Sequence, residues 1–225
     1  MKKLVMLLMI LSVLAGCKKT DNSSTTPPVT ITDINGNIYH TVTIGTQVWM
    51  AENLKTTRFN DGSAIPLITD SATWSNALTP GYCWYNNDSI TVKNPYGALY
   101  NWFAVNTGKL CPPGWHVPTN ADWAILINTL GGDSIVGGKM KESTTKHWKS
   151  PNTGATNVSG FTSLPGGVRT FDNNFYGYTE AGYWWSATEY YEWAATFIVL
   201  GYSYKELYQG TGSARMGLSV RCLKD

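Results

Sequence analysis

The sequence predicts an α+β domain with strands near both ends of the chain and helices between them. Apolar and polar residues alternate soon after residue 30, apolar residues recur at helical spacing near residue 125, and strand-like runs return after residue 180. Strands and helices that are segregated in this way favour α+β over an alternating α/β fold. The 225 residues leave room for a single domain with a substantial core, two or three helices and long ordered loops.

The domain is expected to open at about residue 31 with β-structure. The dipeptide Asn35-Gly36 lies between two alternating runs, and this pair is typical of a tight hairpin turn. In the next strand Ile38, Val42 and Ile44 stand at even spacing, so we expect one apolar face. A second turn and a further strand over residues 45–50 continue the predicted sheet.

Helices are predicted in the middle of the chain. Apolar side chains at i, i+3, i+4 and i+7 after a proline indicate a first helix over residues 95–103. The second is the clearest, because Thr119 is a good N-cap, Asp122 occupies the third helical position and Gly131-Gly132 ends the apolar stripe. A third, short helix is expected over residues 134–142, weakened by two glycines.

The last third of the chain is predicted to consist of loops and strands. From residue 144 onward it is rich in Gly, Asn, Ser and Thr, and aromatic residues are set between them. Such loops stay ordered when aromatic side chains hold them in place. Strands are expected over residues 183–186, 195–200 and 218–222.

The N-terminus resembles the signal of bacterial lipoproteins. Two lysines precede a short apolar run, and Leu14-Ala15-Gly16-Cys17 is similar to the lipobox at which such signals are cleaved. The run is too short for a spanning helix, which needs about 20 apolar residues; an ordinary signal peptide is the other alternative. We therefore expect a signal over residues 1–16, lipidation of Cys17, a polar linker to residue 30 and a domain over residues 31–225. This layout predicts a lipid-anchored envelope protein, at the outer membrane or the cell surface.

Charge and composition exclude some classes of function. Loss of Lys2 and Lys3 with the signal brings 17 basic residues down to 15, equal to the 15 acidic ones. Nucleic-acid binding needs a basic face, so we expect no nucleic-acid partner. Tyr and Trp are abundant, at 13 and 10 copies, and suit cores, interfaces and sugar-facing surfaces alike.

The remaining cysteines are Cys83, Cys111 and Cys222. An exported protein reaches a compartment where disulfides persist, and three cysteines allow at most one internal pair. No two of them are close in sequence and no paired histidine spacing exists, so we expect no metal site built on them.

Several motifs resemble those of the Fibrobacter succinogenes major paralogous domain. The resemblance extends over about residues 31–225, and the family has no established biochemical activity that could be transferred to this chain. The motifs are IGTQVWMAENL at residues 44–54, YGALYNW at 96–102, CPPGWHVPT at 111–119, the segment 160–167, WWS at 184–186 and SVRC at 219–222.

More distantly, the Gly-Trp-His-Val-Pro-Thr stretch resembles the C-type-lectin-like and sulfatase-modifying-factor folds. That resemblance implies one sheet holding both ends of the domain, a long loop region and a disulfide between Cys111 and Cys222; the alternative leaves Cys111 reduced and pairs Cys83. Formylglycine-generating relatives use two nearby cysteines close to the C-terminus, where this chain has Cys222 alone. Iron-dependent relatives use clustered histidines, whereas the three here are scattered. Both departures argue against those activities.

Two aromatic segments rich in Asn are the candidate binding residues. Sugar binding combines stacking on an aromatic ring with hydrogen bonds from amides, and C-type lectins add Ca²⁺, although their usual ligand motifs are absent here. We therefore expect no cofactor, with Ca²⁺ as an alternative. In the competing interpretation the rings fill the core and the Asn side chains cap turns. The candidates are Trp84, Tyr85, Asn86, Asn87 and Asp88 in the first segment, Asn173 and Asn174 in the second, and Trp185 and Glu189 further on.

Catalysis is the weaker expectation. Glu189 and Glu192 could serve glycoside hydrolysis if suitably separated in space, but two such glutamates are more often solvated. His116 could be a ligand or base, but is more often a hydrogen-bonded structural residue. We expect a non-catalytic module that binds a glycan or a surface protein, with a polysaccharide-acting enzyme and a purely structural envelope component as alternatives.

Overall fold

A computed structural model describes residues 29–225. The expected signal, Cys17 and nearly all of the linker lie outside the described residues. The first strand, β1, begins at Thr30, one residue before the expected domain boundary. The described part is mixed α+β, with two five-stranded sheets, one two-stranded sheet and short helices, which confirms the fold class at that level.

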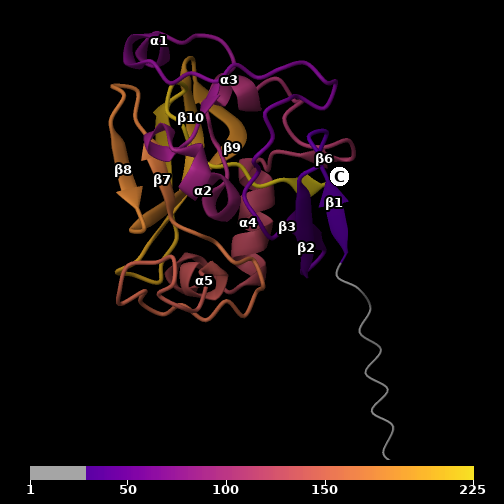
Figure 1. Cartoon of the computed structure of the whole chain (residues 1–225). Coiled ribbons are helices and arrows are strands. Elements are labelled where there is room, and N and C mark those ends of the chain that lie inside the picture. Colours follow the sequence, from indigo (N-terminus) through magenta and orange to yellow (C-terminus); the bar gives the residue numbers. More distant parts are fainter. Residues whose placement is uncertain (1–28) are drawn as a thin grey trace, which may run out of the picture.

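The first sheet joins the two ends of the domain. Its order is β1-β2-β3-β12-β6, and its paired neighbours run antiparallel. The C-terminal strand β12 pairs with β3, and Figure 1 shows the C-terminus beside β6 and β1. The bounds are β1 Thr30–Thr32, β2 Ile38–Ile44, β3 Gln47–Met50, β6 Trp115–His116 and β12 Leu223–Lys224.

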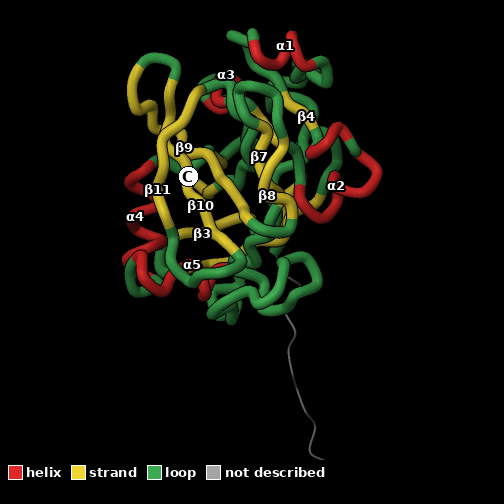
Figure 2. The backbone as a smooth tube through the Cα atoms, turned by 90° about the vertical axis from the view of Figure 1, so that its left-hand side faces the viewer, coloured by secondary structure: helices red, strands yellow, loops and turns green. Residues whose placement is uncertain are grey.

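The second sheet has the order β11-β10-β9-β7-β8, so that β11 and β8 are its edges (Figure 2). Its strands are antiparallel except for the pair β7 and β9. A smaller sheet pairs β4 with β5. The bounds are β4 Tyr82–Cys83, β5 Leu99–Tyr100, β7 Gly166–Arg169, β8 Phe175–Tyr178, β9 Ala181–Tyr191, β10 Ala194–Gly201 and β11 Tyr208–Ser213.

Helix α4, Asn120–Thr129, lies between the two large sheets (Figure 1). The expected N-cap forms a complete capping box, in which Thr119 and Asp122 satisfy each other's backbone N–H groups. Trp123 of α4 packs 4.9 Å from Trp49 of β3 and shares a buried cluster with Trp184 of β9. The other helices are α1 Ser71–Ser75, the 3-10 turn η1 Tyr85–Asn87, α2 Ser89–Tyr96, α3 Trp102–Val105 and α5 Asp133–Met140.

The predicted helix over residues 95–103 is wrong. The α2 helix ends at Tyr96, and Gly97 follows with φ 75°, outside the helical range. The chain then extends, so that Ala98 donates a hydrogen bond to Leu54 O and Tyr100 exchanges two with Leu218. Tertiary pairing with distant segments has overridden the helical spacing of the apolar residues.

The predicted strands are partly confirmed. The segments at 183–186 and 195–200 lie inside β9 and β10. Residues 218–222 form no continuous strand, because Leu218 bridges Tyr100 whereas Ser219 bridges Trp184. In β2, Ile38 is 59% exposed and Tyr39 is buried instead, because the Tyr39 hydroxyl donates to the buried Asp33 carboxylate at 2.7 Å.

Cys111 and Cys222 form the disulfide that the more distant fold resemblance implied. It ties the segment before β6 to the segment before β12 across 111 residues of sequence. Cys83 is free and buried, so the alternative pairing is excluded.

Buried cations hold the long loops. The guanidinium of Arg169 donates to Asn173 Oδ1 and Ile68 O, and stacks on the ring of Trp74 at 4.3 Å. Arg221 donates to Phe161 O and to Asn53 Oδ1, and lies 4.1 Å from the Phe161 ring centroid. Both are at most 1% exposed, and neither forms an ion pair with a carboxylate among the described residues.

Lys141 follows the same pattern. Its ammonium donates to three backbone carbonyls, of Thr153, Gly201 and Tyr204, at 2.7 to 2.9 Å, and lies over the ring of Trp148. A buried charge needs hydrogen bonds that replace its hydration. Backbone carbonyls supply these bonds here, so Lys141 links the loop at Thr153 to the end of β10 at Gly201 and to the turn at Tyr204.

Candidate ligand-binding cleft

The two Asn-rich aromatic segments, which are far apart in the sequence, lie side by side in the fold. Tyr85 of η1 packs against two rings of β8, with its centroid 5.2 Å from that of Phe175 and 5.0 Å from that of Tyr178. The pair with Tyr178 is stacked, at an interplanar angle of 25°. Tyr96 of α2 meets Tyr178 edge-on at 5.1 Å. These contacts fix the orientation of the Tyr178 ring from two sides.

A cleft of about 100 Å³ opens beside this aromatic group. It lies between η1, the first turn of α2 and the end of β8. Its walls carry hydroxyl, amide and carboxylate groups together with aromatic and apolar carbon. The lining residues are Tyr85, Asn86, Asp88, Thr91, Val92 and Tyr178.

The local sequence of η1 exposes two amides. Asn86 and Asn87 have φ of 50° and 58°, a left-handed conformation that Asn tolerates better than most residues. Both side chains are exposed. Asn87 Nδ2 donates to Thr69 O at 3.3 Å, whereas Asn86 carries an amide next to the cleft. Asn86 is therefore the better placed of the two to meet a ligand.

Asp88 serves mainly as the N-cap of α2. Its carboxylate accepts hydrogen bonds from the Thr91 hydroxyl and from the backbone N–H groups of Thr91 and Ile90. These bonds, the Thr91 hydroxyl first among them, lower the pKa of Asp88 below its ordinary value. The carboxylate is thus ionised and oriented, with part of its acceptor capacity already used.

Asn173 and Asn174 act in the turn between β7 and β8. Asn173, at φ 74°, receives hydrogen bonds from the Arg169 guanidinium, and Asn174 Nδ2 donates to Asp172 Oδ2 at 2.9 Å. These contacts agree with the turn-capping interpretation for this pair. Neither residue lines the cleft.

All three candidate aromatic residues belong to the core, although Tyr85, at 9% exposed, also lines the cleft. Trp84 is 5% exposed and Trp185 is fully buried, with its indole N–H donating to Tyr100 O at 2.8 Å. A ring without an exposed face cannot stack on a ligand, so both are corrected from binding residues to packing residues. The exposed rings at this end of the sheet are Tyr178, at 37%, and Tyr176, at 56%. Tyr178 was not identified as a candidate from the sequence. Its position in a short aromatic run after Asn173 and Asn174 was the signal that could have indicated it.

Glu189 lies elsewhere. It is exposed near the end of β9, in register with Ala195 of β10, and does not line the cleft. Glu192 is exposed in the turn that follows. Both glutamates are solvent-facing, as the non-catalytic interpretation of this pair expects.

His116 connects three parts of the fold. Its ring nitrogens lie 2.7 Å from Asp225 Oδ1 and 3.4 Å from Asp122 Oδ2. Asp122 is at the same time the capping-box residue of α4. Strand β6, helix α4 and the C-terminal residue therefore meet at this side chain, which agrees with the hydrogen-bonded structural interpretation.

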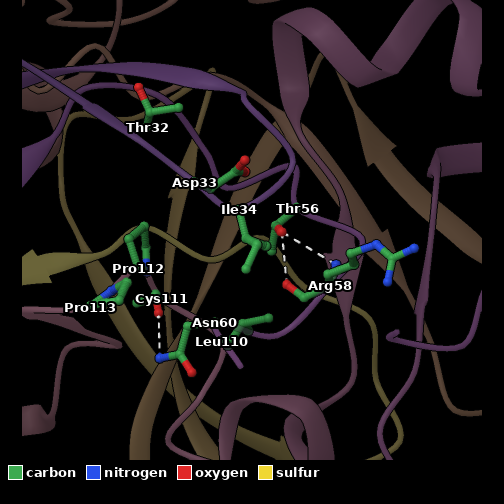
Figure 3. A pocket seen from close by; sticks show the side chains of 10 residues that line it. All are labelled: Thr32, Asp33, Ile34, Thr56, Arg58, Asn60, Leu110, Cys111, Pro112 and Pro113. Atoms are coloured by element: carbon green, nitrogen blue, oxygen red, sulfur yellow. Dashed lines mark hydrogen bonds between the residues drawn. The ribbon is translucent and has the colours of Figure 1, made fainter. Parts of the chain in front are cut away.

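A second hollow of about 190 Å³ lies beside the disulfide (Figure 3). Its polar groups are largely engaged with each other: Asn60 Nδ2 donates to Cys111 O at 3.0 Å, and Thr56 Oγ1 donates to Arg58 O at 2.8 Å. The buried carboxylate of Asp33 is also engaged, with Asn35, Asn37 and Tyr39. The hollow lies where loops meet, and its polar groups bond one another, so they indicate no particular class of ligand.

Within residues 29–225, no three His, Cys, Asp or Glu side chains are grouped as a metal ion would require. In the same part of the chain, no helix has the length and apolarity needed to cross a bilayer.

The fold and the cleft define an α+β domain, closed by one disulfide, that carries a small aromatic and amide-lined cleft at a sheet edge. Residues 42–224 match the Fibrobacter succinogenes major domain, and the chain belongs to this family. No curated protein and no solved structure matches the chain.

Proposed function

We propose that this protein is a lipid-anchored envelope or surface protein whose domain binds a glycan without transforming it. The observation that carries the proposal is a cleft in which residues of the first Asn-rich aromatic segment meet Tyr178, which follows the second segment on β8. The cleft combines an oriented, partly exposed Tyr178 ring with the free amide of Asn86 and the hydroxyl of Thr91. A sugar presents an apolar ring face and several hydroxyls, which match these groups.

The rigidity of the cleft supports binding. Tyr85 and Tyr96 hold the Tyr178 ring, and Arg169 holds the β7–β8 turn from beneath through Asn173. A surface that is already ordered loses little conformational entropy when a ligand binds. The volume of about 100 Å³ is below the 300 Å³ or so of usual small-molecule pockets, so the cleft suits a terminal sugar rather than a long chain segment.

The carboxylate in the cleft argues for binding over hydrolysis. Glycoside hydrolysis uses two carboxyl groups, one of them protonated at working pH. Asp88 is the one carboxylate among the described residues that line the cleft, and its lowered pKa keeps it ionised. The competing hypothesis, an enzyme acting through Glu189, predicts that Glu189→Gln abolishes turnover of envelope polysaccharide. A purely structural component would instead show a stable crosslinked partner and no soluble ligand.

The anchor is proposed from Cys17 and the apolar run before it. A Cys17→Ala change is expected to leave the protein soluble or unprocessed, as membrane fractionation and acyl labelling would show. Continued recovery of the Cys17→Ala protein in the lipidated membrane fraction would contradict the anchor.

The direct test of the function is a glycan array probed with the full-length protein in detergent, once with Ca²⁺ and once with chelator. Reproducible binding to a set of related glycans is expected, and loss of signal with chelator would add Ca²⁺ as a ligand. An array that stays blank in both conditions contradicts glycan binding and favours a protein partner or a structural role.

A further inference from the structure

A larger groove lies at the opposite edge of the second sheet. Its volume is about 400 Å³, which falls within the usual range of small-molecule sites. It is formed where the start of α4 approaches the edge strand β11, its neighbour β10 and the end of β9. Its lining residues are Asn120, Tyr190, Thr196, Gln209, Gly210 and Thr211.

Strand register explains why these side chains share a face. Thr196 of β10 is paired with Thr211 of β11, and Ile198 is paired with Gln209. Ile198 is fully buried in the cluster that contains α4, so the side chains on its face of the sheet point towards that helix. Because α4 begins at Asn120, the outer part of the face is left open, and Gln209 and Thr211 are exposed there.

The groove contains polar groups that the fold does not use. Asn120 Nδ2 donates to Thr196 Oγ1 at 3.3 Å, but the buried Asn120 Oδ1 has no hydrogen-bond partner among the described residues. The side chains of Gln209 and Thr211 likewise bond to no other described residue. A buried acceptor without a partner is uncommon; the exposed side chains of Gln209 and Thr211 are the unused polar groups that a ligand can reach.

The lining specifies the chemical class of a ligand. It contains amide and hydroxyl groups but no Asp, Glu, Lys, Arg or His, so nothing in it would compensate a charged ligand. Tyr190, which lies at one end of the groove, is 61% exposed, and its ring offers a stacking face. A neutral, hydroxyl-rich molecule with one apolar face satisfies both features.

We propose that this groove is a second binding site, and that it takes a neutral saccharide. Tyr190 stacks on the sugar ring, and Gln209 and Thr211 bond its hydroxyls. The inference goes beyond the cleft at β8, because β11 and β8 are opposite edges of one sheet; it rests on the proposed function for the class of ligand. Two sites on one domain would bind a repetitive polysaccharide more tightly than either alone.

The test is a titration of the ¹⁵N-labelled full-length protein in detergent with methyl pyranosides of glucose, galactose, mannose and xylose. At least one of them is expected to shift the side-chain amide signals of Asn120 and Gln209 in a saturable manner. The double variant Gln209→Ala/Thr211→Val should weaken this binding about tenfold, and Tyr190→Ala by a similar factor. Tyr208→Ala is the matched control, because this exposed tyrosine is on β11 but does not line the groove.

The outcomes separate the two sites. Signal shifts confined to Asn86, Asn87 and Tyr178 would overturn the proposed groove site and support the cleft. Shifts confined to the residues of the groove would support the groove site and contradict glycan binding in the cleft. An edge strand can also accept a peptide as an added strand. Shifts of the β11 backbone amides with an extended peptide, and none with any saccharide, would therefore overturn the proposal in favour of a protein partner. The absence of any signal shift, with saccharides and with the peptide alike, would also overturn the proposed groove site.

Discussion

At the scale of single residues, three buried cations hold the long loops of this domain in place. Arg169, Arg221 and Lys141 are buried cations that no carboxylate pairs among the described residues, and all three bond loop carbonyls and contact an aromatic ring. A fork of guanidinium donors, or three ammonium donors, can bond more acceptors than the two N–H groups of a neutral amide such as Asn152, which bonds Glu142 O and Thr144 O. Arg169 also bears on the proposed binding cleft, since it bonds Asn173 in the turn that leads into β8 and its Tyr178.

Lys141→Met is expected to lower the free energy of unfolding by about 3 kcal/mol. The methionine keeps the apolar stem but leaves the carbonyls of Thr153, Gly201 and Tyr204 buried without their donor. Chemical denaturation measures the effect, with exposed Lys146→Met as the control. Equal stabilities of the two variants would show that the ammonium does not hold these loops.

Asp122 predicts a dependence of stability on acid pH. Burial acts to raise its pKa, but hydrogen bonds from Thr119 and the contact with His116 outweigh it, and the net pKa is lowered. A lowered carboxyl pKa gives stability that is complete above the unfolded value, about 3.9, and is lost as pH falls through the folded value. Asp122→Asn should therefore be less stable than wild type by about 1 kcal/mol at pH 5, and this difference should shrink below about pH 4. A difference that stays constant from pH 5 to pH 2.5 would contradict this role.

At the scale of elements, α4 could be predicted in full because its signals are local. The cap, the apolar stripe and the terminal glycines all lie within the helix or next to it, and each is present in the structure. The helix expected over residues 95–103 failed for the opposite reason: its apolar spacing is real, but the partners that draw the chain into β5 are Leu54 and Leu218. Strands β7, β8 and β11 were also missed, since their Gly and Tyr runs show no clear alternation.

Gly97 makes that element boundary testable. A Cβ at this position would lie 2.7 Å from Leu54 O, and the backbone φ is 75°. Gly97→Ala should destabilise by about 3 kcal/mol, from strain and clash together. Gly108→Ala is the matched control, because Gly108 has φ 68° with nothing within 4 Å of its would-be Cβ, and strain alone should cost about 1 kcal/mol. Equal losses in thermal or chemical denaturation would show that close approach to Leu54 does not fix the turn.

On the scale of the whole molecule, one sheet gathers both ends of the domain and a disulfide secures it. The predicted α+β class is confirmed, and so is the Cys111–Cys222 pair, which the more distant fold resemblance implied. The candidate site was foreseen only in part. The exposed amide of Asn86 was identified, but Trp84 and Trp185 proved to be core residues. Local sequence cannot distinguish a ring that fills the core from one that faces solvent, because that choice depends on which distant segments cover it.

Removing the disulfide should destabilise the fold strongly. The double variant Cys111→Ala/Cys222→Ala is expected to lose about 4 kcal/mol of unfolding free energy, because the cross-link closes a very long loop. Cys83→Ala is a useful comparison, since burial raises the pKa of the Cys83 thiol to about 12 and it forms no disulfide. The folded wild type should therefore resist thiol labelling, and rapid labelling of Cys83 would contradict its burial.

The measurement that tests the central claim most directly is the glycan-array signal of Tyr178→Ala beside wild type and Tyr208→Ala, all as full-length protein in detergent. Tyr178 is the oriented ring of the cleft, whereas Tyr208 is an exposed tyrosine on the opposite edge of the same sheet. The account predicts that Tyr178→Ala weakens binding to at least one glycan class about tenfold, with Tyr208→Ala unchanged. Unaltered glycan binding by Tyr178→Ala would show that the cleft between η1 and β8 is not the binding site.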